Sequence, residues 1–196
     1  ATHYHPELRR RLLDFAQQQV PVLVQDAHTR LHDYYHQRSA ENGNTAAPGG
    51  LTLYRDAHWR ADRLETLYHG LMLKDVETIQ QGVTTFLAAL RVYYPLAGEI
   101  AVTWEEAAQA QLTGNAVVEW SDLLQTAWQA LEQQDWEAAL ACCDACAQRE
   151  DAGETIQREL QAIRPIVLAR LGRFTAEPIT QAPEAGEFAG EAAIIE

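Results

Sequence analysis

Apolar side chains recur every three or four residues over most of this chain, and that spacing predicts amphipathic α-helices. Helical segments are expected at residues 21–37, 54–73, 75–94, 117–133, 135–149 and 154–171, with a shorter one at 103–112. The segment before Pro21 is expected either to kink into the next helix or to restart there. The sequence therefore predicts an all-α fold, a helical bundle of about six to seven helices.

Local signals mark several helix boundaries. Asp75 can cap the helix that follows it, and Pro95 is expected to stop that helix. Thr103 and Glu106 have the spacing of a capping box, which predicts a helix start at Thr103. Residues 39–51 contain Asn-Gly-Asn and Pro-Gly-Gly, so this stretch is expected to be the longest internal loop.

The helix after Pro21 carries one continuous apolar stripe, which we expect to face the core. Its members are Val20, Leu23, Val24, Ala27, Leu31, Tyr34 and Tyr35. Histidines on the same helix lie beside this stripe, where half-exposed polar side chains are expected on any amphipathic helix.

Charge is distributed unevenly along the chain. The 196 residues carry 15 Lys and Arg against 28 Asp and Glu, a net charge of −13. Residues 1–103 are nearly neutral, with 10 basic against 11 acidic side chains, whereas residues 104–196 have 5 against 17. A field of this sign repels phosphate backbones and anionic lipid, so neither direct nucleic-acid binding nor membrane binding is expected.

Composition and charge together suggest three regions. Residues 1–100 form an N-terminal helical bundle, residues 101–173 a helical hairpin region, and residues 174–196 an extended acidic tail. The tail is rich in Ala, Gly, Pro and Glu, and this composition cannot bury enough apolar area to fold by itself. We expect the tail to lie on its own core or on a neighbouring chain.

The cysteines and the absence of targeting signals indicate the compartment. Cys142, Cys143 and Cys146 lie within five positions of one predicted helix, so they cannot link distant segments, and we expect them to pack as small apolar side chains. The first residues lack the apolar core of a signal peptide, and no stretch approaches the roughly 18 apolar residues of a membrane-spanning helix. A soluble, cytoplasmic protein is therefore expected.

Residues 128–140 resemble a tetratricopeptide repeat. Trp128, Leu131, Trp136 and Ala139 place large and small apolar side chains around a tight turn, and residues 168–174 look like the start of another repeat. The resemblance implies helix pairs that stack into a groove for peptides or other proteins. The alternative is an ordinary antiparallel hairpin inside a bundle. Six aromatic and aliphatic residues are candidate partner-binding residues: Trp128, Trp136, Phe174, Phe188, Ile194 and Ile195.

Two predicted helices carry side chains that can bind a metal ion. The candidate ligands are His28 and His32 on one helix, and His58, Asp62, Glu65 and His69 on the other. Each set lies on one face of its helix because its members are three or four residues apart. Two such faces turned toward one another can hold iron or zinc, as in carboxylate–histidine bundles. The alternative is that both are solvated helix faces.

These patterns favour a non-catalytic protein–protein interaction protein, an adaptor or assembly subunit that docks through its acidic helical C-terminal half. Its partner would be another protein or a second copy of the chain, and it would need no cofactor. No glycine-rich phosphate loop and no Gly-x-Ser-x-Gly or His-Glu-x-x-His motif occurs in the chain. Two alternatives remain open: a metal-binding, di-iron-like helical-bundle enzyme that uses iron or zinc, and an acidic nucleic-acid mimic that acts as an inhibitor.

Overall fold

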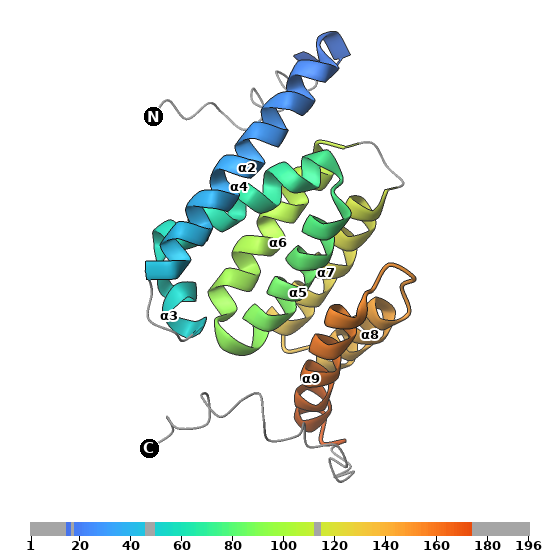
Figure 1. The fold of residues 1–196 in the computed structure, drawn as a ribbon. Coiled ribbons are helices and arrows are strands. Elements are labelled where there is room, and N and C mark those ends of the chain that lie inside the picture. Colours follow the sequence, from blue (N-terminus) through green and yellow to red (C-terminus); the bar gives the residue numbers. More distant parts are fainter. Residues whose placement is uncertain (1–14, 17, 46–49, 112–114, 174–196) are drawn as a thin grey trace.

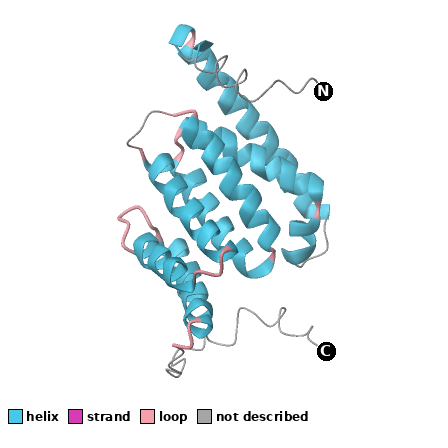
Figure 2. Ribbon diagram, turned by 180° about the vertical axis from the view of Figure 1, so that it is seen from behind, coloured by secondary structure: helices cyan, strands magenta, loops and turns pink. Residues whose placement is uncertain are grey.

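A computed structural model of the protein describes residues 15–16, 18–45, 50–111 and 115–173 (Figure 1). Within these ranges the chain is all-α, as the sequence predicts, and no β-strand is present (Figure 2). The helices are α2 (Pro21–Thr45), α3 (Gly50–Arg55), α4 (Ala57–Leu73), α5 (Val76–Val92), α6 (Tyr94–Gln109), α7 (Ala116–Glu132), α8 (Trp136–Ala147) and α9 (Glu154–Arg170).

Aspartate side chains set several of the helix starts. The Asp56 carboxylate accepts hydrogen bonds from the backbone N–H groups of His58 and Trp59, at 2.8 and 3.0 Å. This cap starts α4 after Asp56, so the short helix α3 that precedes it is separate and adds one helix to those predicted. Asp75 caps α5 through the N–H of Thr78, which confirms that prediction.

The predicted helix start at Thr103 is wrong. α6 begins at Tyr94, and Pro95 lies in its first turn, where a missing backbone N–H costs no helical hydrogen bond. Thr103 lies inside this helix, and its hydroxyl donates to the backbone oxygen of Glu99 at 2.9 Å. A capping box requires a first residue outside the helix, and here the chain that reaches Thr103 is already helical.

Helices α4 to α9 enclose the hydrophobic core of the described region. Its largest fully buried side chains include Leu71, Phe86, Trp104, Trp120 and Ile156, which come from five different helices. The core therefore runs across residue 100, and the region boundary that the sequence suggested there falls inside α6.

The last three helices attach to the rest of the bundle because α7 packs on α6 and α9 packs on α5. α7 and α8 are joined at residues 133–135 and pack against each other, while α9 packs on α8 and α5. Asp151, just before α9, accepts hydrogen bonds from the indole N–H of Trp120 at 3.0 Å and from the guanidinium of Arg149 at 2.7 Å. This carboxylate thus connects the loop between α8 and α9 to α7.

α2 lies outside the core. Figure 1 shows it across the outer side of α4, with its first turns projecting beyond the bundle. It continues to Thr45, through residues that the sequence assigned to a loop, and Ser39 in this part is buried with its hydroxyl donating to the backbone oxygen of His36 at 2.9 Å. Neither α2 nor any other described helix is both long and apolar enough to cross a membrane.

Candidate functional site

The outer face of α4 determines which face of α2 can pack against it. Leu67 and Leu71 of α4 are buried in the core, so the opposite face of this helix carries Asp62, Glu65 and His69. A polar face can be buried only against groups that form hydrogen bonds with it or offset its charge. α2 supplies such groups, and it therefore packs on α4 through its polar face.

His28 of α2 and His69 of α4 meet at the centre of this interface, and both are buried. Their Nδ1 atoms are 2.8 Å apart, so one ring donates its Nδ1 hydrogen and the other accepts it. The Tyr35 ring stacks on His69 with 6.1 Å between ring centroids, and a Glu65 carboxylate oxygen lies 3.6 Å from His69 Nε2. The contact persists only while at least one of the two rings is neutral, because two protonated rings would oppose two donors.

Ten residues further along α2, Arg38 pairs with Asp62 of α4. The distance between Arg38 Nη2 and Asp62 Oδ1 is 3.1 Å, and the Asp62 side chain is only 4% exposed. The two helices are antiparallel, because the α2 residue number rises from His28 to Arg38 while its α4 partner falls from His69 to Asp62. A guanidinium is therefore already the partner of one candidate metal ligand.

The candidate metal ligands are spread along the α2–α4 interface. His32 Nε2 lies 3.4 Å from the Thr78 hydroxyl, and His58 is exposed in the first turn of α4. No group of three or more His, Cys, Asp or Glu side chains in the described part of the chain is arranged to hold a metal ion. The structure therefore brings together His28 and His69 but not the six candidates.

The alternative expectation, that both polar stripes are solvated, is wrong for three of the six residues. His28, Asp62 and His69 are buried. Helical spacing identified the polar face correctly, but it could not show that a second polar face would cover it.

With its polar face on α4, α2 exposes most of its predicted apolar stripe, although Val24 is half-buried and Tyr35 stacks on His69. Leu23, Leu31 and Tyr34 are 65%, 40% and 52% exposed, and Val20 and Ala27 are also exposed. The prediction that this stripe faces the core is therefore wrong. The physical reason is that most of the apolar face of α4 is already used in the core, so α4 offers α2 mainly polar side chains, with Met72 and Leu73 near Val24 as apolar exceptions.

Two of the six candidate partner-binding residues lie in the described region, and both are half-buried against the core. Trp128 stacks on Tyr94 with 4.3 Å between ring centroids, and the Arg170 guanidinium lies 5.7 Å from the Trp136 ring centroid. Phe174, Phe188, Ile194 and Ile195, together with the predicted acidic tail, lie outside the described residues.

The cysteines have the environment of buried apolar side chains. Cys142 and Cys146 are buried, Cys143 is half-buried, and all three are free thiols. Burial raises the pKa of Cys143 to about 11 and that of Cys146 to about 12. These thiols carry almost no thiolate at neutral pH, whereas reactive or metal-binding cysteines need that form.

The repeat interpretation of the C-terminal half stays a prediction. α7 and α8 supply the helical hairpin on which the resemblance rests, with Asp135 capping α8 through the backbone N–H of Ala138 at 3.0 Å. No protein-family model matches this chain, and comparisons with curated proteins and with solved structures find no match.

Proposed function

We propose that this chain is a non-catalytic interaction protein, an assembly subunit that pairs through α2 with a second copy of itself. The observation that supports this proposal most directly is the outer stripe of α2, defined as Val24, Ala27, Leu31 and Tyr34 together with Val20 just before the helix; all but the half-buried Val24 are exposed. Contiguous apolar surface is unfavourable in water, and on folded proteins it marks sites of association.

The outer stripe has the spacing of a coiled-coil seam. Its successive members are separated by four, three, four and three residues, as the a and d positions of a heptad repeat are. At about 1.5 Å per residue the stripe is about 21 Å long. Leu23, which is 65% exposed, lies beside the stripe and widens the apolar surface. A second α2 offers matching side chains, so the two stripes can interlock.

The charge on α2 is compatible with pairing between identical chains. Two copies of a chain with a net charge of −13 repel one another across most of their surfaces. α2 is different because Arg30 and Arg38 nearly balance Asp26, Asp33 and Glu41, and Arg30 pairs with Asp26 at 2.9 Å. Two acidic molecules can therefore approach through α2 with little repulsion.

Pairing through α2 leaves the acidic C-terminal half available for a basic protein. Both figures place α8 and α9 on the side of the bundle away from α2. Arg149, Arg164 and Arg173 of this half already pair with carboxylates of the fold. Glu132 and Glu150 are exposed and have no ion-pair partner among the described residues. This excess of unpaired carboxylates supports docking of a basic partner, as the charge distribution in the sequence suggests.

Light scattering coupled to size-exclusion chromatography tests the pairing. The single chain has a mass of 21.9 kDa, so the wild-type mass is expected to rise toward twice that value over about 5–200 μM protein. Glutamate at Leu31 in the seam and at Leu23 beside it brings like charges together when two copies pair, and this double variant is expected to stay at the mass of one chain.

Ile166→Glu is the matched control, because Ile166 is also an exposed aliphatic residue on a helix, 49% exposed on α9. It should dimerise like the wild type. A wild-type mass of one chain at the highest concentration would overturn the pairing, and so would unchanged dimerisation of the Leu23→Glu, Leu31→Glu variant.

The acidic docking surface has its own test. A basic partner recovered with the chain is expected to be released as salt rises from about 0.05 to about 0.5 M, because screening weakens contacts between exposed charges. Deletion of residues 174–196 should reduce its recovery, since this segment contains acidic residues and no Lys or Arg. Recovery that is indifferent to both changes would refute docking on the acidic half.

A further inference from the structure

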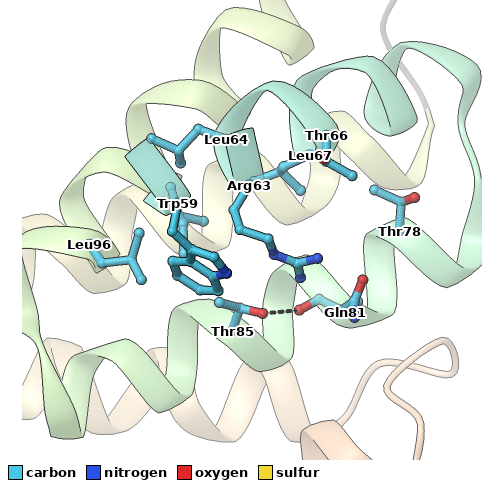
Figure 3. Close-up of a pocket in the computed structure, with 11 residues that line it drawn as sticks. Trp59, Arg63, Leu64, Thr66, Leu67, Thr78, Gln81, Thr85 and Leu96 are labelled. Carbon is cyan, nitrogen blue, oxygen red and sulfur yellow. Dashed lines mark hydrogen bonds between the residues drawn. The ribbon is translucent and has the colours of Figure 1, made fainter. Parts of the chain in front are cut away.

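A pocket lies between α4, α5 and α6, apart from the outer stripe of α2 (Figure 3). Its volume is about 410 Å³ when the open space at its mouth is included, so it is a cleft open to solvent and not an enclosed cavity. Its apolar wall includes Trp59, Leu64, Leu67, Leu96 and Ile100. Such a wall favours the apolar part of a ligand.

The positive charge of Arg63 lies in this pocket. Figure 3 shows the Arg63 side chain extending from α4 past the indole of Trp59 toward Gln81. The guanidinium carbon is 5.9 Å from the Trp59 ring centroid. Desolvation by burial lowers the pKa of Arg63, against a smaller opposing effect of Tyr54, but a guanidinium stays protonated at neutral pH.

No residue in the described part of the chain forms a hydrogen bond or an ion pair with Arg63. Other half-buried arginines are paired: Arg60 donates to the carboxylate of Glu99 at 3.0 Å, and Arg149 donates to that of Asp151 at 2.7 Å. A partly desolvated charge without a counter-charge reduces stability. This cost is offset when a bound anion supplies the missing negative charge.

We infer that the pocket binds a small monocarboxylate with a flat apolar body. The planar guanidinium of Arg63 can bind both carboxylate oxygens at once, a geometry that a lysine does not provide. The side-chain amide of Gln81 lies beside it and can donate to the same group (Figure 3). The indole of Trp59 offers a flat surface for the ligand body. An inorganic anion would leave the apolar wall unfilled.

Isothermal titration calorimetry with benzoate tests this inference on the full chain. Benzamide has the same shape without the charge, and inorganic phosphate has charge without an apolar body. Both are expected to bind at least about tenfold more weakly than benzoate, because each loses one of the two interactions. Equal affinity for benzoate and benzamide would overturn the role of the charge, and equal affinity for phosphate would overturn that of the apolar wall.

Variants at Arg63 locate the site. Arg63→Gln is expected to weaken benzoate binding about tenfold or more, and Arg63→Lys to give an intermediate loss because it keeps the charge but not the two-pronged contact. Arg55→Gln is the control, since Arg55 is an exposed arginine on α3. Benzoate binding that survives Arg63→Gln, or no binding of benzoate to the wild type at about 5 mM, would refute the inference. The comparison of benzoate with benzamide on the wild type decides the role of the charge even if a variant fails to fold.

Discussion

Gly82 of α5 lies against the indole ring of Trp104, and this contact makes a sharp prediction about the core. A Cβ atom added at Gly82 would lie 2.7 Å from Cζ3 of Trp104 and 2.7 Å from Cδ1 of Leu67. Both distances are far below the usual contact between carbon atoms, about 3.5–4.0 Å. Gly82→Ala therefore requires one of these neighbours to move.

Two opposing terms set the size of the effect of Gly82→Ala on the free energy of unfolding. Alanine in place of glycine inside a helix stabilises by about 1 kcal/mol, whereas overpacking a core costs about 1–3 kcal/mol. Leu67 has a flexible end that can shift. Trp104 is fully buried and its indole N–H donates to the backbone oxygen of Val117 at 2.8 Å, so its ring is held. We therefore expect the cost to lie near its upper end and the net destabilisation to be about 1–2 kcal/mol.

The second half of the prediction is that Gly82→Ala no longer destabilises the protein when Trp104 is replaced by phenylalanine. Phenylalanine lacks the outer ring atoms that meet the added Cβ, so Gly82→Ala should become neutral or stabilising by up to about 1 kcal/mol in the Trp104→Phe background. Trp104→Phe by itself is expected to cost about 2–4 kcal/mol, because it leaves a cavity and removes the hydrogen bond to Val117.

The wild type, the two single variants and the double variant form a double-mutant cycle. Their free energies of unfolding are measured by urea unfolding followed by far-ultraviolet circular dichroism, which does not rely on tryptophan fluorescence. The coupling between the two substitutions is expected to be about 1–3 kcal/mol. Additivity within about 0.5 kcal/mol would show that the two residues do not touch. A Gly82→Ala variant more stable than the wild type would show that the space beside Gly82 is not closed.

Two further predictions concern ionisable groups. The pKa of Cys143 is about 11 and that of Cys146 is about 12. Each thiol should therefore react with iodoacetamide at pH 8 at least about 100-fold more slowly in the native protein than in urea, as measured by mass spectrometry. Similar rates in the two conditions would contradict the burial of these thiols. The Arg149 guanidinium and the Trp120 indole hold the pKa of Asp151 below its usual range, so its ionised form stabilises the fold at neutral pH. Asp151→Asn is expected to lower the free energy of unfolding by only about 1 kcal/mol, because the side chain is 35% exposed. The difference in stability between this variant and the wild type should shrink as pH falls below about 4. A difference that grows toward acid pH would contradict the stabilising role of the ionised Asp151.

The correct and incorrect sequence predictions separate by the range of the interactions behind them. The helix start after Asp75 was predictable because that carboxylate binds the backbone N–H of Thr78, three residues away. The start at Thr103 was not, although its pattern is equally good, because it depends on the helix that already begins at Tyr94. A cap signal identifies a boundary only where no longer helix runs through it.

The candidate sites also divide into features set by local sequence and features set by long-range contacts. The spacing of His28 and of the apolar stripe on α2 was visible in the sequence. Their environments were the opposite of those expected: most of the apolar positions are exposed, whereas the histidine is buried. Nothing in the sequence distinguished Arg63 from other arginines, since its pocket is formed by side chains of three helices. No local pattern could have revealed that it lacks a carboxylate partner in the described part of the chain.

By itself, therefore, the sequence determined the helical content, most helix boundaries and the concentration of negative charge in the second half, since these depend on composition and on residues within about four positions. Only the tertiary structure decided that α2 turns its polar face to α4, because His28 and Arg38 meet partners 41 and 24 residues away in the chain. α4 had one apolar face, and the core used it. The second helix that packed on α4 therefore buried polar side chains and left most of its own apolar stripe exposed.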